Sequence, residues 1–255
     1  MRFHNKIAVI TGAGSGIGKA AAERLAKEGA TVILAGRTKE KLEAARDSIN
    51  QQCGAEKAHL FQSDVTKEED VQGLAQFAGK FGPPHIVINN AGGSGQSKIL
   101  ETSSEDWDFV QKANLKSVFL VSKILGSLMK DDEEGRRSDR SIVNVASLSA
   151  YKAGAHIPHY SAAKAGVVNF TKALALELSP YGVRVNSVSP GFIETPLTEG
   201  GLKNAKFTES IERSTALRRV GKPEEIANII ALAASSEASY MTGTDLLADG
   251  GWLIV

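Results

Sequence analysis

The order of segments along the chain predicts an α/β fold, built on one doubly wound, seven-stranded parallel sheet with helices on both faces. Short runs rich in β-branched residues alternate with helix-like stretches over all 255 residues, which is the pattern of strands joined by crossover helices. Several of these runs are apolar at nearly every position. That composition is typical of parallel strands that are covered on both sides.

Seven strands and six helices fit this alternation. The strands are expected at residues 6–12, 31–37, 59–65, 85–92, 141–147, 183–191 and 245–251. The helices are expected near residues 17–29, 38–52, 67–80, 100–130, 160–179 and 223–236. No repeat or low-complexity linker interrupts this order, so residues 1–255 are predicted to form a single domain.

Two segments depart from the alternation. The charge-dense connection at residues 131–140 is expected to be a solvated loop. Residues 192–222 are longer and more polar than an ordinary strand-to-helix connection. A long excursion after a sheet strand is a candidate lid over a site, and we place this lid at about residues 192–215.

Composition excludes several classes of protein. Hydrophobic residues make up 42% of the chain and charged residues 23%, with a net charge of +1, so no nucleic-acid or anionic-membrane surface is indicated. Cys53 is the only cysteine, which rules out an internal disulfide and favours a reducing, cytoplasmic location. No signal-peptide pattern or apolar run of membrane-spanning length is present.

A glycine-rich turn, TGAGSGIG (11–18), lies between the first expected strand and a helix pattern. Its spacing is G-x3-G-x-G, formed by Gly12, Gly16 and Gly18. Such glycines permit a tight turn and close approach of the backbone, while the helix N-terminus offers free N–H groups to a pyrophosphate. The placement favours a dinucleotide site over a purely structural turn, and Ser15 and Ile17 are expected to contact the cofactor there.

The end of the second expected strand, VILAGRTKEK, indicates which dinucleotide binds. A carboxylate at this tip would hold the ribose 2′-hydroxyl of NAD, whereas an arginine accepts the 2′-phosphate of NADP. No acid occurs at the tip; Gly36 leaves room, and Arg37 and Thr38 supply donors. The alternative is an arginine that merely leads into a surface helix. We favour NADP(H) over NAD(H).

The stretch YSAAKAG (160–166) places Tyr160 four residues before Lys164. On a helix these positions share one face, about one turn apart. A nearby cation favours the phenolate and lowers the pKa of a tyrosine, which would make the pair an acid–base catalyst. An amphipathic tyrosine and a lysine on a helix surface fit the same four residues. The pair alone does not decide between these interpretations.

Together, several motifs resemble the compact branch of the short-chain dehydrogenase/reductase family, from about residue 5 to the C-terminus. The motifs are TGAGSGIG (11–18), Asp64–Val65, NNAG (89–92), Asn114 in KANLKS, Ser147 in VNVASLSA, YSAAK (160–164), PGFIETP (190–196) and DGG (249–251). The resemblance implies a Rossmann-type fold and a nicotinamide cofactor. It also implies hydride transfer between a small carbonyl compound and its alcohol.

The resemblance also implies residue roles. Tyr160 would exchange a proton with the substrate oxygen, and Ser147 would polarise the carbonyl. Lys164 would lower the pKa of Tyr160 and bind the nicotinamide ribose, while Asn114 would anchor a water that links Lys164 to solvent. Further cofactor contacts would come from residues near the adenine, its ribose and the nicotinamide carboxamide. These are Asp64, Val65, Asn90, Ala91, Gly92, Pro190, Gly191, Ile193 and Thr195.

Three functions are compatible with this family resemblance. An NADP(H)-dependent carbonyl reductase or secondary-alcohol dehydrogenase leads, with a 3-oxoacyl-thioester reductase as its nearest specific form. An enoyl-thioester reductase is disfavoured, because such relatives space their Tyr and Lys differently. An NADPH-sensing scaffold protein is the non-enzyme alternative, which the presence of all four expected catalytic residues opposes.

Other features concern metal binding, assembly and specificity. His156 and His159 are three apart but have no Cys or acidic partner at ligand spacing, so no metal site is predicted. The segment 162–178 is apolar around most of its circumference, which with the apolar C-terminal residues favours a homotetramer. Substrate specificity is expected to come from residues 93–99, 148–159 and 192–215.

Overall fold

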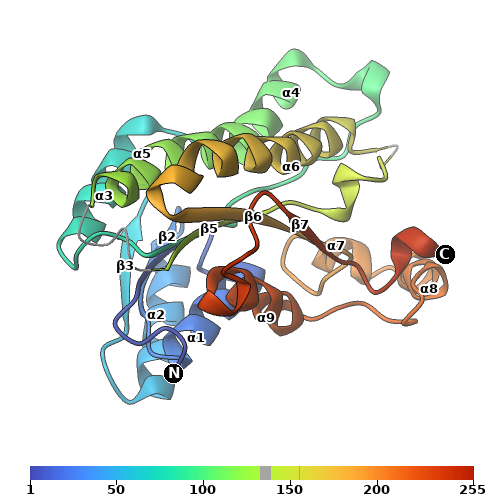
Figure 1. Ribbon diagram of the computed structural model, residues 1–255. Helices are drawn as coiled ribbons and strands as arrows, with labels where there is room; N and C mark the ends of the chain where they lie inside the picture. Colours follow the sequence, from blue (N-terminus) through green and yellow to red (C-terminus); the bar gives the residue numbers. More distant parts are fainter. Residues whose placement is uncertain (133–138, 155) are drawn as a thin grey trace.

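The computed structural model describes residues 1–132, 139–154 and 156–255, and a seven-stranded sheet runs through it (Figure 1). The strands are β1 (Ile7–Thr11), β2 (Thr31–Gly36), β3 (Ala58–Gln62), β4 (Ile86–Asn89), β5 (Arg140–Val145), β6 (Val183–Pro190) and β7 (Asp245–Ala248). All neighbouring strands pair in parallel, in the order β3-β2-β1-β4-β5-β6-β7. The strand order therefore reverses between β1 and β4, where open sheets of this kind bind their ligands.

Helices cover both faces of the sheet, which confirms the predicted fold class. Helices α1, α2 and α9 lie on one face of the sheet, and α3, α5 and α6 lie on the other (Figure 1). The helices are α1 (Gly16–Lys27), α2 (Lys39–Cys53), α3 (Glu68–Gly79), α4 (Ser104–Gln111), α5 (Ser117–Asp131), α6 (Pro158–Leu178), α7 (Glu199–Leu202), α8 (Ala205–Ser214) and α9 (Pro223–Ala234). Within the described residues, no helix is both long and apolar enough to cross a bilayer.

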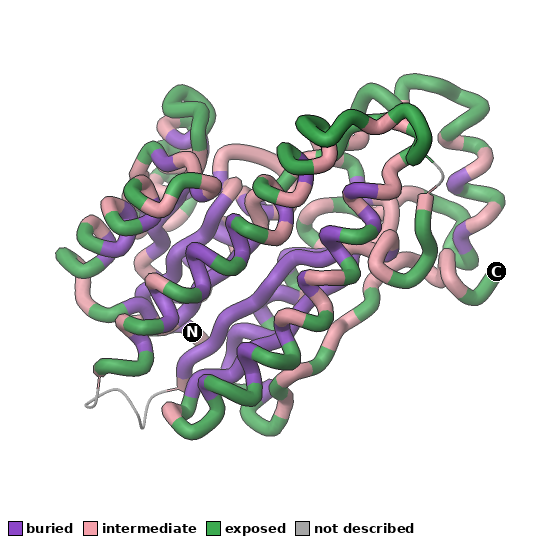
Figure 2. The backbone as a smooth tube through the Cα atoms, turned by 90° about the horizontal axis from the view of Figure 1, so that it is seen from above, coloured by how far each residue is buried: buried purple, intermediate pink, exposed green. Residues whose placement is uncertain are grey.

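The core follows the central strands. Every residue of β1, β4, β5 and β6 is buried, and Figure 2 shows buried strands running through the middle of the molecule. Fully burying one Val or Ile side chain stabilises a fold by about 1.5–3 kcal/mol. The nearly continuous apolar character of these strands therefore holds both layers against the sheet.

Polar side chains buried in β6 have specific backbone partners. The guanidinium of Arg184 donates to the carbonyls of Ala233, Ser235 and Ala238 at 2.9–3.0 Å and pairs with Asp139 at 3.1 Å. A buried charge is tolerated when its donors are satisfied in this way. These bonds fix the end of α9 against the sheet.

The expected long helix over residues 100–130 is interrupted. It consists of α4 and α5, joined by a π-helical stretch, Lys112–Lys116, that contains Asn114. A π-bulge inserts one extra residue into the turn and re-aims the neighbouring side chains. The charged connection predicted at residues 131–140 lies mostly outside the described residues, because 133–138 are not among them.

Two further elements differ from the expected ones. The strand expected at residues 59–65 ends at Gln62, so Asp64 and Val65 lie in the loop that follows β3. The long segment after β6 is partly helical, since it contains α7 and α8. The side chain of Asn204 accepts hydrogen bonds from the backbone N–H groups of Lys206 and Phe207, which starts α8 there.

His85 gives the fold a pH-dependent contact. Its Nδ1 accepts a hydrogen bond from the backbone N–H of Ile7 at 3.1 Å, next to the start of β1. Burial lowers the pKa of His85 below its ordinary value of 6.5, and the charges of Lys6 and Arg140 lower it further. The neutral form is therefore favoured in the fold, and its stabilisation is present above the unfolded-state pKa and lost as pH falls below it.

We expect the free energy of unfolding to decrease between pH 7 and pH 5, and His85→Asn to weaken that decrease. Asparagine can accept the same hydrogen bond through Oδ1 without titrating. Chemical denaturation across this pH range measures the effect, with His156→Asn at an exposed site as the control. An unchanged pH dependence in His85→Asn would contradict the assignment.

Candidate active site

Two adjoining cavities lie at the carboxyl ends of the strands. One encloses about 240 Å³ beside β1, β2 and the loop after β3, and the other about 380 Å³ beside β5, β6 and α6. They meet at Gly92 and Gly93, in the loop that follows β4. The pair therefore forms an elongated site across the point where the strand order reverses.

The glycine-rich turn forms the floor between the cavities. Gly12 has φ +64° and Gly16 φ +53°, conformations that favour glycine. A Cβ on Gly18 would collide with Asn90 Nδ2 and lie 2.5 Å from the carbonyl oxygen of Gly12. The turn is held by Thr11, whose Oγ1 accepts from the backbone N–H groups of Asn90 and Ala91 at 3.0 Å. The backbone is thus exposed for close approach, as a pyrophosphate requires.

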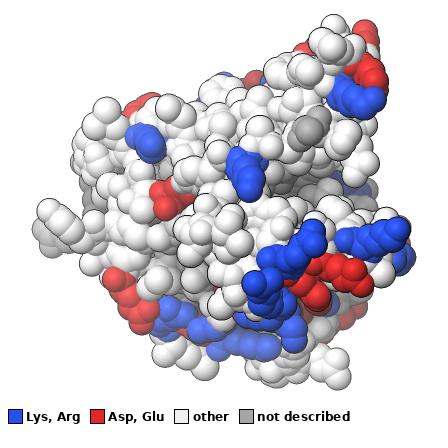
Figure 3. All heavy atoms as spheres, turned by 90° about the vertical axis from the view of Figure 1, so that its right-hand side faces the viewer, with Lys and Arg blue, Asp and Glu red and all other residues white. Residues whose placement is uncertain are grey.

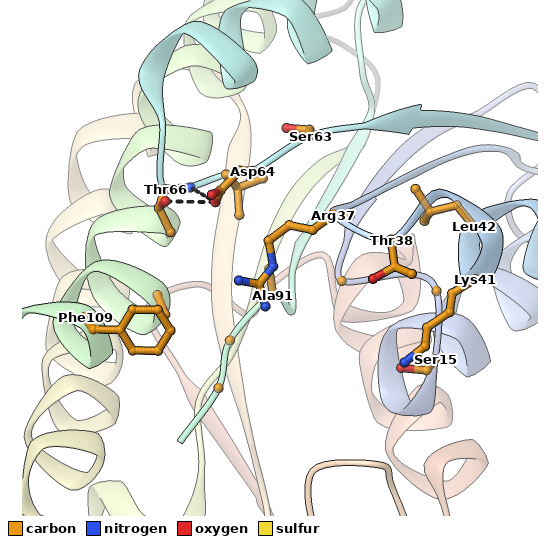
Figure 4. A pocket seen from close by; sticks show the side chains of 17 residues that line it. Ser15, Arg37, Thr38, Lys41, Leu42, Ser63, Asp64, Thr66, Ala91 and Phe109 are labelled. Carbon is orange, nitrogen blue, oxygen red and sulfur yellow. Dashed lines mark hydrogen bonds between the residues drawn. The ribbon is translucent and has the colours of Figure 1, made fainter. Parts of the chain in front are cut away.

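Two cations line the smaller cavity (Figure 4). Arg37 and Lys41 line it together with Ser15 and Thr38, and Figure 4 shows the Arg37 side chain extending toward Ala91. Among the described residues, neither the guanidinium of Arg37 nor the ammonium of Lys41 has a hydrogen-bond or ion-pair partner. Cations placed this way can receive a phosphate.

Asp64 lines the same cavity, where the charge of Arg37 acts on its carboxyl. Burial acts to raise the pKa of its carboxyl, but hydrogen bonds from the side chain and backbone N–H of Thr66 and the charge of Arg37 outweigh burial. The pKa is therefore below its ordinary value, and Asp64 is ionised at neutral pH. Val65, Ser63 and Phe109 complete this end of the site.

The larger cavity gathers the four side chains expected to be catalytic. Ser147 lies two residues after the end of β5, and Asn114 comes from the π-helical stretch. Tyr160 and Lys164 come from the first two turns of α6. Pro158 occupies the first position of α6, where its fixed φ suits helix initiation. The helix then places Lys164 one turn beyond Tyr160, with Nζ 5.6 Å from the Tyr160 ring centroid.

Burial controls the electrostatics of this pair. It lowers the pKa of Lys164 to about 8, and its Nζ donates to the carbonyl oxygen of Val145 at 2.8 Å. Burial also raises the pKa of Tyr160, which a hydrogen bond with Ser147 opposes only in part. The net pKa of Tyr160 is therefore above its ordinary value in this structure, and not below it as expected. Tyr160 is a protonated hydroxyl at neutral pH because desolvation outweighs the effect of its neighbours.

Asn114 fixes the loop that joins the two cavities. Its Nδ2 donates to the carbonyl oxygens of Gly93 at 2.6 Å and Val110 at 2.9 Å, and its Oδ1 accepts from the backbone N–H of Gly93 at 3.2 Å. A Cβ on Gly92 would lie 2.6 Å from this Oδ1. The π-helical stretch thus clamps the strand-end loop beside Lys164.

The structure brings the predicted cofactor residues to this site in two groups. Those lining the smaller cavity are Gly12, Ser15, Arg37, Thr38, Asp64, Val65, Ala91 and Gly92. Those lining the larger cavity are Ile17, Asn90, Gly92, Pro190, Gly191, Ile193 and Thr195, with Tyr160 and Lys164. Gly16 and Gly18 line neither cavity and instead pack beneath Thr195 and Asn90.

Lys41 and Phe109 line the smaller cavity but were missed from the sequence. Lys41 lies in the first turn of α2, four residues after Arg37, and this cluster of cations at a strand tip could have pointed to it. Phe109 lies on α4 and is brought in only by the tertiary fold.

The two histidines before Tyr160 have different environments. His159 is buried, with no hydrogen-bond partner at Nδ1, while His156 is exposed. In the part of the chain that the structure describes, no cluster of three His, Cys, Asp or Glu side chains is placed to hold a metal ion.

The residues at this site fit a dinucleotide. Side chains at the glycine turn would fill the space that a ligand needs. Two cations with no hydrogen-bond or ion-pair partner among the described residues line one end of the site, and a tyrosine and a serine line the other. The elongated shape spans both ends across the strand tips.

Comparison with known proteins agrees with this geometry. A family model described as "Enoyl-(Acyl carrier protein) reductase" matches residues 12–253. The chain belongs to the short-chain dehydrogenase/reductase family. It is similar to the 3-oxoacyl-[acyl-carrier-protein] reductase of Thermotoga maritima, with 39% identity over 100% of both chains. Meso-2,3-butanediol dehydrogenase of Serratia marcescens is 38% identical over 98% of this chain and 96% of that protein.

Solved structures of the family have the same fold. A short-chain type dehydrogenase/reductase from Mycobacterium marinum superimposes with a TM-score of 0.92 and 37% identity, over 99% of this chain and 97% of the other. This protein is accordingly an oxidoreductase of a family that binds a nicotinamide cofactor.

Proposed function

We propose that this protein is an NADP(H)-dependent oxidoreductase that interconverts a ketone and a secondary alcohol by hydride transfer. The observation that carries the proposal is the gathering of Ser147, Tyr160, Lys164 and Asn114 in one cavity, continuous with a glycine turn. The butanediol dehydrogenase relative supports this reaction class.

Each of these residues has a separate role in ketone reduction. The nicotinamide, when bound, supplies or accepts the hydride. The hydroxyl of Tyr160 donates its proton to the carbonyl oxygen as negative charge develops there, and its raised pKa keeps that proton in place at neutral pH. Ser147 donates a second hydrogen bond to the same oxygen. The Lys164 ammonium stabilises the phenolate that remains, and Asn114 holds the loop beside it.

The two cations of the smaller cavity favour NADP(H) over NAD(H). Arg37 and Lys41 can bind a 2′-phosphate, and Gly36 leaves room for it at the end of β2. Asp64, the carboxylate of this cavity, belongs to the loop after β3 rather than to the tip of β2. At the tip of β2, where a carboxylate could hold the ribose 2′-hydroxyl of NAD, this chain has Arg37 instead.

A 3-oxoacyl-thioester reductase is the second candidate. It is favoured by the Thermotoga maritima relative, which matches the chain over its whole length. Enoyl-thioester reduction is supported only by the description of the matching family model. The four-residue spacing of Tyr160 and Lys164 opposes this function, because enoyl reductases of the family space these two residues differently. A scaffold protein that only senses NADPH would not require all four side chains in one cavity.

Initial rates with NADPH and NADH test these functions. The panel contains an acetoacetyl thioester, a crotonyl thioester, a cyclic ketone and a 1,2-diketone. Ketone reduction that prefers NADPH supports the proposal, and preference for the acetoacetyl thioester selects the second candidate. Reduction of the crotonyl thioester alone, or tight binding of NADPH without any turnover, would contradict the proposal.

We also propose a homotetramer. Phe119 on α5 and Leu176 on α6 are 43% and 79% exposed, and Ile254 and Val255 at the C-terminus are 84% and 66% exposed. Apolar groups at two separate places on the surface suit two kinds of subunit contact. Light scattering coupled to size exclusion should give four times the chain mass of 27.0 kDa. A stable monomer at micromolar concentration would refute this assembly.

A further inference from the structure

The part of the larger cavity beyond Tyr160 has mostly apolar walls. They come from the loop after β4, the segment after Ser147 and the lid after β6. The apolar side chains that line it are Leu148, Ile157, Phe192, Leu197 and Phe207. A substrate that reaches Ser147 and Tyr160 must place its body among these groups.

The wall offers no free charge to a substrate. Of the described residues that line the cavity, Lys164 alone has a charged side chain, and its Nζ is bonded to the carbonyl oxygen of Val145. Charged side chains of the lid lie elsewhere: Glu194, Glu199 and Lys203 line a separate outer hollow, where Lys203 pairs with Glu199 at 2.8 Å. Figure 3, which views this side of the molecule, shows acidic and basic side chains adjacent on the outer surface.

We propose that the site selects a compact, uncharged carbonyl compound with an apolar body, and rejects substrates whose body carries a carboxylate or phosphate. This inference rests on the proposed function and names its substrate class. A buried anion without a cationic partner loses its hydration and gains nothing comparable in return. The volume of about 380 Å³ must also hold the nicotinamide end of the cofactor, so the space left suits a small body.

The lid wall is fixed in place by aromatic packing. The rings of Phe192 and Phe207 are 6.0 Å apart and nearly perpendicular, and Phe192 also packs 4.8 Å from Trp252. A Cβ on Gly201 would lie 2.9 Å from Phe207 Cε1, so glycine at residue 201 leaves room for the Phe207 ring in this position. The apolar wall is therefore a built feature of the lid.

Neutral polar groups interrupt the wall, and two of them come from the loop after β4 and from the segment after Ser147. Gln96 and Ser149 line the cavity without bringing a charge. An amide and a hydroxyl can hydrogen-bond a second oxygen of an uncharged substrate, such as a keto, hydroxyl or ester oxygen. The best substrates are therefore expected to carry such an oxygen near the reacting carbonyl.

A matched pair of substrates tests the proposal. Methyl acetoacetate and acetoacetate share the reacting ketone and differ in one charge, and kcat/KM is measured for both with NADPH. We expect the ester to exceed the acid by at least about 100-fold. Equal values would overturn the proposal and leave the proposed function standing, whereas no reduction of any neutral ketone would remove both.

A variant with an added cation provides a second test of the proposal. Leu197 lines the cavity from the lid, so Leu197→Arg should lower the ester-to-acid ratio at least about 10-fold, and Leu197→Met should leave the ratio unchanged. If Leu197→Arg does not fold, Gln96→Arg places the charge in another segment of the same wall. A ratio that stays the same in a folded arginine variant would count against the proposal.

Discussion

Replacing Tyr160 by phenylalanine should lower kcat for ketone reduction about 10³-fold and change the Kd for NADPH only a few-fold. The variant keeps the ring that lies against Lys164 and removes only the hydroxyl proton. Positioned proton donors contribute about 10²–10⁴-fold to such reactions. Steady-state kinetics and fluorescence titration of NADPH measure the two quantities.

Tyr240→Phe is the matched control, because Tyr240 is fully exposed and lies outside both cavities. It removes the same hydroxyl from the surface and should retain normal kcat. A Tyr160→Phe enzyme with more than a tenth of the native kcat would show that another group delivers the proton.

Arg37→Ala should reduce kcat/KM for NADPH by about 10–100-fold and leave that for NADH nearly unchanged. Hydrogen bonds to charged groups contribute about 1.5–3 kcal/mol, which corresponds to this range. Among the described residues the guanidinium of Arg37 makes no hydrogen bond or ion pair, so its loss removes from the protein only the charge that acts on Asp64. Adding Lys41→Ala should extend the loss, because both cations face the same space.

Arg46→Ala serves as the control on the same helix. Arg46 lies on the exposed side of α2, where it pairs with Asp47 at 2.8 Å and lines neither cavity. This variant should keep the native ratio of NADPH to NADH activity. A native enzyme that prefers NADH, or an Arg37→Ala variant with an unchanged ratio, would refute the assignment of the phosphate site.

The fold was predictable because its signals are local or repeat along the chain. The residues of each buried strand are mostly apolar, and each helix has its own periodic pattern of apolar residues. Both signals can be recognised within a short stretch of sequence, as for β1 and α1. The same holds for Tyr160 and Lys164, because a spacing of four residues fixes their common face on α6. Their motifs could therefore be located before any tertiary contact was known.

The remaining features depend on contacts between distant segments. Phe109 enters the smaller cavity because α4 lies across the end of the sheet. The break around Asn114 forms where its side chain bonds to Gly93, 21 residues away. The raised pKa of Tyr160 comes from the depth of its burial, which a short motif does not encode.

The segment after β6 combines local signals with contacts between distant segments. Its length led us to predict a lid there, and Asn204 is a recognisable helix start. Its specificity depends on where Phe207 lies relative to Phe192 and Trp252, which belong to other segments. Sequence therefore located the substrate wall, and the structure supplied its chemical character.

Transfer of deuterium from NADPH to product tests the central claim most directly. The enzyme is incubated with a neutral ketone and NADPH that carries deuterium at one of the two C4 positions, and the alcohol is analysed by mass spectrometry. The account predicts that one of the two labelled forms gives an alcohol with a single deuterium on the carbinol carbon. Binding of NADPH with no labelled alcohol from either form would contradict it.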